Sequence, residues 1–214
     1  MAQLPKRLLD GYSAFKSGRF EEDRERYHQL AEIGQTPKIM LIGCCDSRAT
    51  PEQIFDAGPG EMFIVRNVAN LVPPAQKEDD YHGTPAALEF AIQGLKVEHI
   101  VIMGHGQCGG VRAFLDDEFQ PLSEGDYIGK WVSLLQPACC DKKFDELKRD
   151  DLDRQGLLER SSVIQSLNNL RTFPCVRELE KEGKLCLHGA WFNIATGDLE
   201  YFEKDQDTFV KVDS

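Results

Sequence analysis

Residues 97–115 read VEHIVIMGHGQCGGVRAFL, and they predict a strand and a helix joined by a short turn. Residues 97–105 form an apolar run rich in valine and isoleucine, which is typical of a buried strand. The glycine-rich turn that follows leads into a segment where a helix is expected to begin near Cys108. Strands that alternate with helices in this way indicate a mainly parallel sheet covered by helices on both faces.

The rest of the chain repeats this alternation. Further strands are expected at 37–44, 61–67, 184–194 and 199–204. The last two are separated by a Thr-Gly-Asp turn and should form a hairpin. The predicted fold class is therefore α/β, a small and mostly parallel β-sheet flanked by helices.

Helix signals lie between these strands. Thr50 and Thr84 are good N-cap residues, each followed by a proline, and Gly94 is expected to end the second of these two helices. Later helices are expected at 157–173 and 174–183. The polar, turn-rich stretch 114–129 indicates a loop insertion and not a domain boundary.

Length and charge limit the classes of function. The 214 residues suit a single globular domain, over 1–214, and the formal net charge is −11. An acidic surface repels phosphate groups, which argues against nucleic acid and anionic membranes as partners. Residues 1–30 indicate an amphipathic helix and not a signal peptide, and no stretch approaches the length of a transmembrane helix. A cytoplasmic location is expected.

Cysteine usage points to chemistry. The chain has seven cysteines, an odd number, and a disulfide framework is not expected in a reducing compartment. Cys44 ends the first predicted strand, His105 ends the third, and Cys108 precedes a helix. Functional groups collect at the carboxyl ends of parallel strands, so these three residues can converge. Two thiolates and one imidazole are a zinc ligand set, and three protein ligands leave a position open for catalysis. A structural zinc site and a plain glycine-rich turn are the alternatives.

The motif GCCDSR at 43–48 adds two charged groups. Side chains alternate along an extended chain, so Cys44, Asp46 and Arg48 should share one side and Cys45 should pack in the core. Asp46 could ligate zinc or accept a hydrogen bond from zinc-bound water, and Arg48 could hold it ionised through two parallel hydrogen bonds. A surface or N-cap ion pair is the alternative. A zinc ion held by two thiolates and a neutral His105 has a formal charge of zero, so its bound water should be less acidic than in a three-histidine site. Activity is therefore expected to require neutral to alkaline pH.

The remaining histidines and thiols are assigned no ligand role. His28, His82, His99 and His188 are interpreted as structural or solvated residues. Cys139 and Cys140 lie in a turn-like stretch and are interpreted as incidental thiols.

The two motifs together, Cys44-Cys45-Asp46-Ser47-Arg48 and His105-Gly106-Gln107-Cys108, resemble the beta-class carbonic anhydrases. The resemblance extends from about Gln35 to Leu199 and includes the stretches at 59–74, 83–105 and 187–199. It implies reversible hydration of carbon dioxide to bicarbonate and a proton. One Zn²⁺ per subunit would be held by Cys44, His105 and Cys108, and a zinc-bound hydroxide would be oriented by the Asp46–Arg48 dyad.

The same resemblance implies a substrate pocket. Gln35 matches a glutamine that hydrogen-bonds substrate in the plant-like subgroup, Phe63 and Val68 match apolar wall residues, and Gly109 follows the second cysteine as expected. Phe90 is a departure, because that subgroup often has tyrosine there. A second subgroup, in which the aspartate ligates zinc, has a tryptophan three residues before the first zinc cysteine. Leu41 holds that position here. An open site without the allosteric bicarbonate site of that subgroup is therefore expected.

The resemblance further implies an N-terminal helical arm, residues 1–34, that embraces a partner subunit, and a zinc-binding α/β core, residues 35–214. A homodimer is the minimum assembly, a tetramer is expected, and active sites lie at the dimer interface. Hydrolysis of carbonyl sulfide or carbon disulfide, and a non-catalytic zinc or redox sensor using Cys44 and Cys45, are the competing hypotheses. His28, His82 and buffer are all open as proton carriers.

Overall fold

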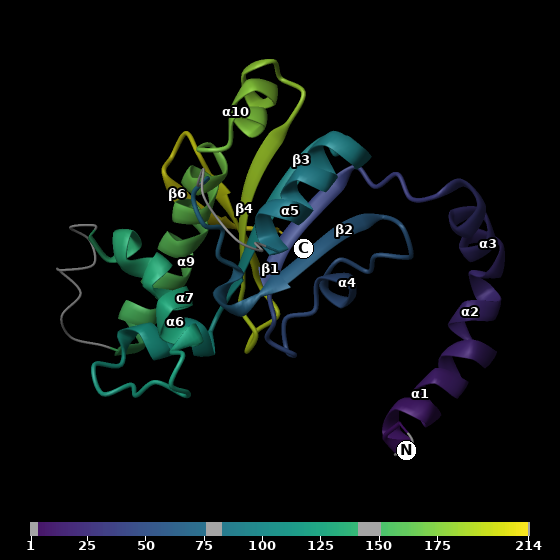
Figure 1. Ribbon diagram of the computed structural model, residues 1–214, viewed down its shortest axis with the longest axis horizontal. Helices are drawn as coiled ribbons and strands as arrows, with labels where there is room; N and C mark the ends of the chain where they lie inside the picture. Colours follow the sequence, from purple (N-terminus) through teal and green to yellow (C-terminus); the bar gives the residue numbers. More distant parts are fainter. Residues whose placement is uncertain (1–3, 76–82, 141–150, 214) are drawn as a thin grey trace.

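The structure is a computed structural model, and it describes residues 4–75, 83–140 and 151–213. His82, one of the candidate proton carriers, lies outside these ranges. The chain forms one sheet with helices around it and an N-terminal helical arm (Figure 1).

The sheet has six strands in the order β2-β1-β3-β4-β5-β6. The first four are parallel to one another, and β5 and β6 are antiparallel additions at one edge. The five predicted strands and the hairpin are confirmed, whereas β6 was not predicted. The strands are β1 Ile39–Cys44, β2 Met62–Asn67, β3 His99–His105, β4 Cys186–Phe192, β5 Leu199–Glu203 and β6 Thr208–Lys211.

The helices follow the predicted order with several shifted ends. The longest one, α9, begins six residues before the predicted start at 157. The segment 114–129 contains the end of α6 and the start of α7. The helical elements are α1 Lys6–Ser17, α2 Arg19–Glu22, α3 Arg24–Ile33, α4 Pro51–Ile54, η1 Val68–Asn70, α5 Gly83–Glu89, η2 Phe90–Leu95, α6 Gly109–Leu115, α7 Tyr127–Val132, η3 Ser133–Cys140, α9 Asp151–Leu170 and α10 Pro174–Lys181.

The predicted caps were only partly right. Helix α4 begins at Pro51, but the Thr50 side chain makes no capping hydrogen bond. Thr84 lies inside α5, and its hydroxyl accepts a hydrogen bond from the Asn67 amide at 3.2 Å. Gly94 does not end its helix, because the chain continues as a π-helix to Leu95 and stops at Lys96, which is left-handed at φ 57°. Tertiary contacts therefore override the local signals here.

The two faces of the sheet are covered unequally. One face packs against α5, η2, α9 and α10, and its buried residues form the largest apolar cluster. The opposite face has a small cluster of three buried residues, Leu41, Met103 and Ala190, with Ile54 of α4 packed against it. On this second face, the side chains at the start of β3 are consequently partly exposed and those at the start of β4 are exposed.

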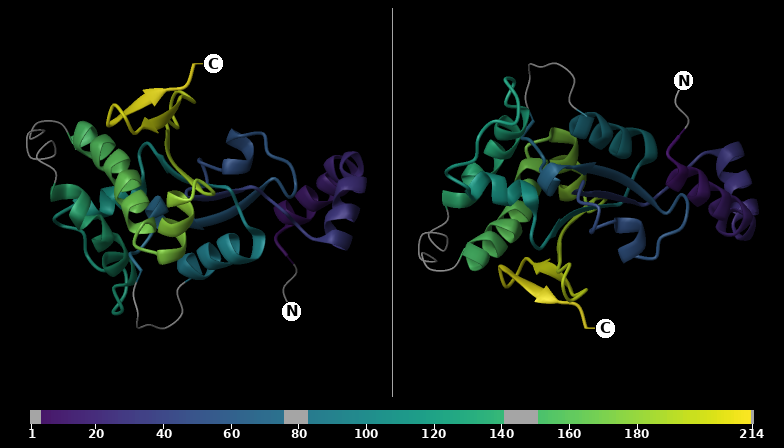
Figure 2. Two further views of the ribbon diagram at one scale, coloured as in Figure 1. Left: turned by 90° about the horizontal axis from the view of Figure 1, so that it is seen from above. Right: turned by 90° about the horizontal axis from the view of Figure 1, so that it is seen from below.

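A further apolar cluster lies at the carboxyl ends of the strands. It joins α6, α7, η3 and the first part of α9, and it includes Cys44 and Cys108. Figure 2 shows these helices gathered at one end of the molecule, away from the arm. The two thiols are therefore set in packed surroundings that limit their movement.

The arm, α1 to α3, has no buried residue in any of its helices. Its aromatic side chains Phe15, Phe20 and Tyr27 pack on one another, and Arg26 pairs with Glu61 of the core at 3.0 Å. Figure 1 shows it in purple to one side of the sheet. Within the described ranges, none of the helices has the length and apolar character needed to span a bilayer.

Candidate metal centre

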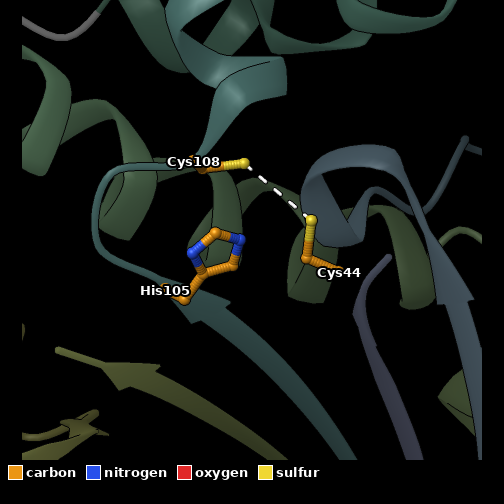
Figure 3. A group of neighbouring side chains, drawn as sticks. All are labelled: Cys44, His105 and Cys108. Atoms are coloured by element: carbon orange, nitrogen blue, oxygen red, sulfur yellow. Dashed lines mark hydrogen bonds between the residues drawn. The ribbon is translucent and has the colours of Figure 1, made fainter. Parts of the chain in front are cut away.

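Cys44, His105 and Cys108 meet at the carboxyl edge of the sheet. Strands β1 and β3 are parallel neighbours, so their last residues, Cys44 and His105, end side by side. Gln107 adopts a left-handed conformation, φ 59°, and this tight bend turns Cys108 back toward the strand ends. Figure 3 shows both sulfur atoms and one ring nitrogen of His105 turned toward the same space.

The spacing of these three side chains fits a tetrahedral zinc ion. The two Sγ atoms lie 4.0 Å apart, and two sulfur ligands at about 2.3 Å from a tetrahedral zinc would be about 3.8 Å apart. The ligand atoms of all three residues lie within 4.8 Å of one another, and all three residues are buried.

His105 is held in the correct state to be a ligand. Its Nδ1–H donates to the carbonyl of Gly106 at 2.9 Å, which leaves the Nε2 lone pair free. That Nε2 atom is buried and has no hydrogen-bond partner among the residues that the structure describes. An unpaired buried polar atom costs about 1–3 kcal/mol, so the position favours an occupant that accepts this lone pair. The residues present therefore fit zinc.

The two thiols interact directly, with their Sγ atoms 4.0 Å apart. A hydrogen bond from Cys108, and then the nearby His105, hold the pKa of Cys44 well below its usual range against the opposing effect of burial. The same pairing, together with burial, raises the pKa of Cys108. The Ala69 N–H also donates to Sγ of Cys44 at 3.4 Å. A divalent cation between the sulfur atoms would supply the positive charge that lets both act as thiolates.

Glu159 of α9 supports the Cys108 loop from behind, and the sequence reasoning missed it. Its carboxylate accepts hydrogen bonds from the Cys108 N–H at 2.9 Å, from Gln155 at 2.9 Å and from Trp191 at 3.2 Å. Burial raises its pKa, and these hydrogen bonds oppose that effect. The available signal was a charged residue on the helix face that also carries Val163.

Asp46 and Arg48 form the pair that the motif predicted. Nε and Nη2 of Arg48 donate to the two carboxylate oxygens at 2.9 and 2.7 Å, and the Arg48 backbone N–H adds a third bond at 3.0 Å. The guanidinium is the main reason that the pKa of Asp46 lies well below its usual range. Oδ2 of Asp46 lies 3.9 Å from Nε2 of His105, beside the ligand cluster.

Three further hydrogen bonds, from two arginines, fix the segment from Cys44 to Arg48, and one expectation about this segment was wrong. Arg66 donates to the backbone carbonyls of Cys44 and Asp46 at 2.8 and 2.7 Å, and Arg48 donates to the Gln107 carbonyl at 3.1 Å. Cys45 is exposed, not packed in the core. Strand β1 ends at Cys44, so Cys45 lies just beyond the strand. The alternation of side chains correctly separates Cys45 from Cys44, but at this position no other element of the described ranges covers the side to which Cys45 points.

The expected pocket residues fall into two groups. Gly109 begins α6 directly after Cys108, and Val68 lies against Gly110 of that helix. Phe63 and Phe90 pack on each other with ring centroids 5.8 Å apart.

The aromatic pair is distant from the ligand cluster within one chain. Phe63 is the register partner of Met40, four residues before Cys44, or about 13 Å along the strand. Gln35 is exposed on the connection between α3 and β1. The chain thus brings Val68 and Gly109 to its own ligand cluster, whereas it places Gln35, Phe63 and Phe90 elsewhere.

The family model described as carbonic anhydrase matches residues 39–199. Beta carbonic anhydrase 3 of Arabidopsis thaliana is 35% identical over 208 residues, covering 93% of this chain and 77% of that protein. Beta carbonic anhydrase 6 of the same plant, described as mitochondrial, is 35% identical over 200 residues, covering 90% of this chain and 66% of that protein.

Solved structures agree with this match. The beta-carbonic anhydrase CcaA superposes with a TM-score of 0.88 at 26% identity, over 98% of this chain and 92% of that one. A tetrameric beta-carbonic anhydrase from Sordaria macrospora superposes with a TM-score of 0.78 at 30% identity, over 91% and 94%. By sequence, fold and the geometry of its ligand cluster, the chain belongs to the beta-class carbonic anhydrases, a family of lyases.

Proposed function

We propose that the chain catalyses the reversible hydration of carbon dioxide to bicarbonate and a proton, with one Zn²⁺ per subunit held by Cys44, His105 and Cys108. The observation that carries the proposal is the buried and unpartnered Nε2 of His105, which accompanies two thiols at the spacing of a zinc site. When bound, zinc supplies a Lewis acid that lets a water molecule act as a nucleophile near neutral pH.

Asp46 is proposed to orient the nucleophilic water. Its Oδ2 atom is near the ligand cluster and can accept a hydrogen bond from a water there. Arg48 engages both carboxylate oxygens, which keeps Asp46 an acceptor and fixes its direction. Asp46 therefore turns a lone pair of the water toward the carbon of carbon dioxide. The Arg66 bonds to the adjacent backbone hold the carboxylate in place during this step.

The substrate pocket is proposed to draw on two subunits. Carbon dioxide is small, uncharged and apolar, so apolar walls suit it. Val68 and Gly109 would come from the chain that holds the zinc, and a Cβ at Gly109 would meet no atom within 4 Å, which indicates open space. Gln35, Phe63 and Phe90 would come from the partner subunit, because in their own chain they lie far from the cluster. Phe90 is 53% exposed and so has surface to offer a partner.

Assembly into a homodimer, and from dimers into a tetramer, is proposed on the same grounds. The arm has no buried residue, and its apolar side chains Leu8, Leu9 and Tyr12 are exposed. Apolar patches of this kind mark interaction surfaces. Replacing Leu8 and Tyr12 together by aspartate should shift the sedimentation coefficient to that of a smaller species. Gln29→Glu, at an exposed position of α3, is the control and should leave it unchanged.

The proposed location is a reducing compartment, and specifically the cytoplasm. Five of the described cysteines, Cys44, Cys45, Cys108, Cys175 and Cys186, are free thiols, as such a compartment favours. Cell fractionation with cytoplasmic and mitochondrial marker proteins tests this, because one relative is described as mitochondrial. Co-sedimentation of the protein with the mitochondrial marker would contradict the proposal.

The experiment that tests the activity is stopped-flow carbon dioxide hydration on zinc-loaded protein. The rate should rise from neutral to alkaline pH and vanish when zinc is removed. Asp46→Asn should keep its zinc and lose about a hundredfold in rate, because a positioned acceptor is gone. Asp205→Asn, an exposed carboxylate, is the matched control.

Two outcomes would contradict the proposal. A fully active Asp46→Asn variant would remove the assigned role of the dyad. Folded, zinc-loaded protein without hydration activity would instead favour carbonyl sulfide hydrolysis or a sensor.

A further inference from the structure

A second cluster of metal-ligating side chains lies at the amino-terminal ends of the parallel strands, opposite the end that carries Cys44 and His105. Strands β3 and β4 are parallel, and their register places His99 directly beside Cys186. His188 follows Cys186 by two residues and therefore points to the same face. The ligand atoms of the three residues lie within 4.8 Å of one another.

The distance between the two imidazoles is that of a shared metal ion. Nδ1 of His99 and Nε2 of His188 are 3.1 Å apart. Two nitrogen ligands at about 2.0–2.1 Å from a tetrahedral zinc would be about 3.3 Å apart. The rings are tilted by 47° with centroids 5.2 Å apart, so they meet at their nitrogen atoms and are not stacked face to face.

The chemistry of the donors selects the class of ion. Two imidazoles and one thiol suit zinc and similar borderline transition metals, whereas calcium and magnesium need carboxylate and carbonyl oxygens. The neighbouring carboxylate, Glu98, is engaged by Lys38 at 2.6 Å.

The backbone holds the cluster in place while leaving it open to solvent. The Cys186 N–H donates to the Glu98 carbonyl at 2.9 Å, so the starts of the two strands are joined beside the cluster. Cys186 and His188 are exposed, on the sparsely covered face. His99 and Cys186 also line a cavity of about 670 Å³ that reaches α10. Because Cys186 and His188 are exposed, an ion can reach their donor atoms from solvent.

We propose that His99, Cys186 and His188 form a second metal site, which binds a zinc-class divalent ion with three protein ligands and one water. The site is separate from the Cys44–His105–Cys108 cluster and does not depend on the proposed hydration activity. Because it is exposed, it should exchange its ion faster than the buried cluster.

The test uses the whole protein with one zinc already bound. Cobalt(II) is titrated into this zinc-loaded enzyme, and its uptake is followed by thiolate-to-cobalt charge-transfer absorption and by elemental analysis after gel filtration. We expect one additional cobalt per chain with a thiolate signal. Cys186→Ser and His188→Gln should each lower the affinity for this cobalt ion by more than about a hundredfold. Loss of a residue that only hydrogen-bonds to a metal ligand already lowers metal affinity by about 10–100-fold, and loss of a ligand should cost more.

Matched thiol variants provide the control. Cys175→Ser removes a thiol that lines the same cavity but is not in the cluster, and Cys45→Ser removes an exposed thiol at the other edge. Both should take up cobalt as the unaltered protein does. Uptake that survives Cys186→Ser and His188→Gln, or is lost in Cys175→Ser, would overturn the assignment. So would a zinc-loaded enzyme that takes up no further ion.

Discussion

The two edges of the sheet carry similar ligands in opposite surroundings. At the carboxyl edge, Cys44, His105 and Cys108 are 5%, 1% and 1% exposed. At the amino edge, Cys186 and His188 lie on an exposed face beside a partly exposed His99. Donor chemistry alone thus does not distinguish the two clusters, whereas their burial does.

The difference lies in what surrounds each set of ligands. The buried cluster is backed by the Glu159 carboxylate and by the Asp46–Arg48 pair, and Nε2 of His105 is buried without a hydrogen-bond partner among the described residues. The exposed cluster can be satisfied by solvent. We therefore expect the buried cluster to need its ion for stability and activity, and the exposed cluster to fold equally well with or without one.

The largest expected effect comes from removing one thiol at each edge. Cys108→Ser should lose zinc and at least about a hundredfold in hydration rate, because a direct ligand matters more than the outer partners worth 10–100-fold. Cys186→Ser should leave the hydration rate unchanged. Zinc per chain and stopped-flow rates, measured on both variants in parallel, check this. Full zinc content in Cys108→Ser would disprove the ligand assignment.

A medium effect is expected from the carboxylate behind the buried cluster. Glu159→Gln keeps the shape but has one acceptor oxygen for three N–H donors, so at least one buried donor loses its partner. The free energy of unfolding should fall by about 1–3 kcal/mol. Urea unfolding at fixed protein concentration and zinc competition with a chelator measure the two consequences.

Glu200→Gln is the control for this variant. It removes a charge that pairs with Arg160 at 2.7 Å and should cost less than about 1 kcal/mol because the pair is partly exposed. Equal losses in the two variants would mean that Glu159 has no special role behind Cys108.

The smallest expected effect is a pH dependence at the exposed cluster. The pKa of His188 is lowered in the folded protein, so below the ordinary value of about 6.5 the unfolded chain binds more protons. Stability should therefore fall as pH drops through about 6.5 and level off below the folded pKa, by less than about 1 kcal/mol because the ring is partly solvated. His188→Gln should reduce this slope in metal-free protein, as followed by urea unfolding between pH 5 and 8. An unchanged slope would show that other groups dominate.

Much of the fold and of the buried cluster could be predicted from the sequence. The apolar runs before Cys44 and His105 identified two strands, and the rule that the carboxyl ends of parallel strands meet at one side of a sheet then predicted that Cys44, His105 and Cys108 could converge. The Asp46–Arg48 pair followed from their spacing and opposite charge.

The rest depends on contacts between segments far apart in the chain. His99 and His188 were interpreted as structural or solvated residues because their nearness to Cys186 arises from the β3–β4 register, which no local pattern encodes. Cys45 was wrongly predicted to be buried, because the alternation of side chains along a strand does not reveal which parts of the sheet are covered by helices. Strand β6, with only four residues, gives too short a pattern to be seen.

The arm has one more consequence, for the order of events during synthesis. Helices α1 to α3 leave the ribosome before β1, and none of their side chains is buried in the chain's own core. If the arm contacts a partner subunit as proposed, the segment used for assembly is made before the core and covered after it. Leu8, Leu9 and Tyr12 are exposed in the single chain, so on that proposal they stay exposed until a partner has folded, and aggregation is a risk during this interval. The net charge of −11 gives the arm no protection of its own, because residues 1–34 carry six basic and six acidic side chains and the excess of acidic residues lies wholly in the core that follows.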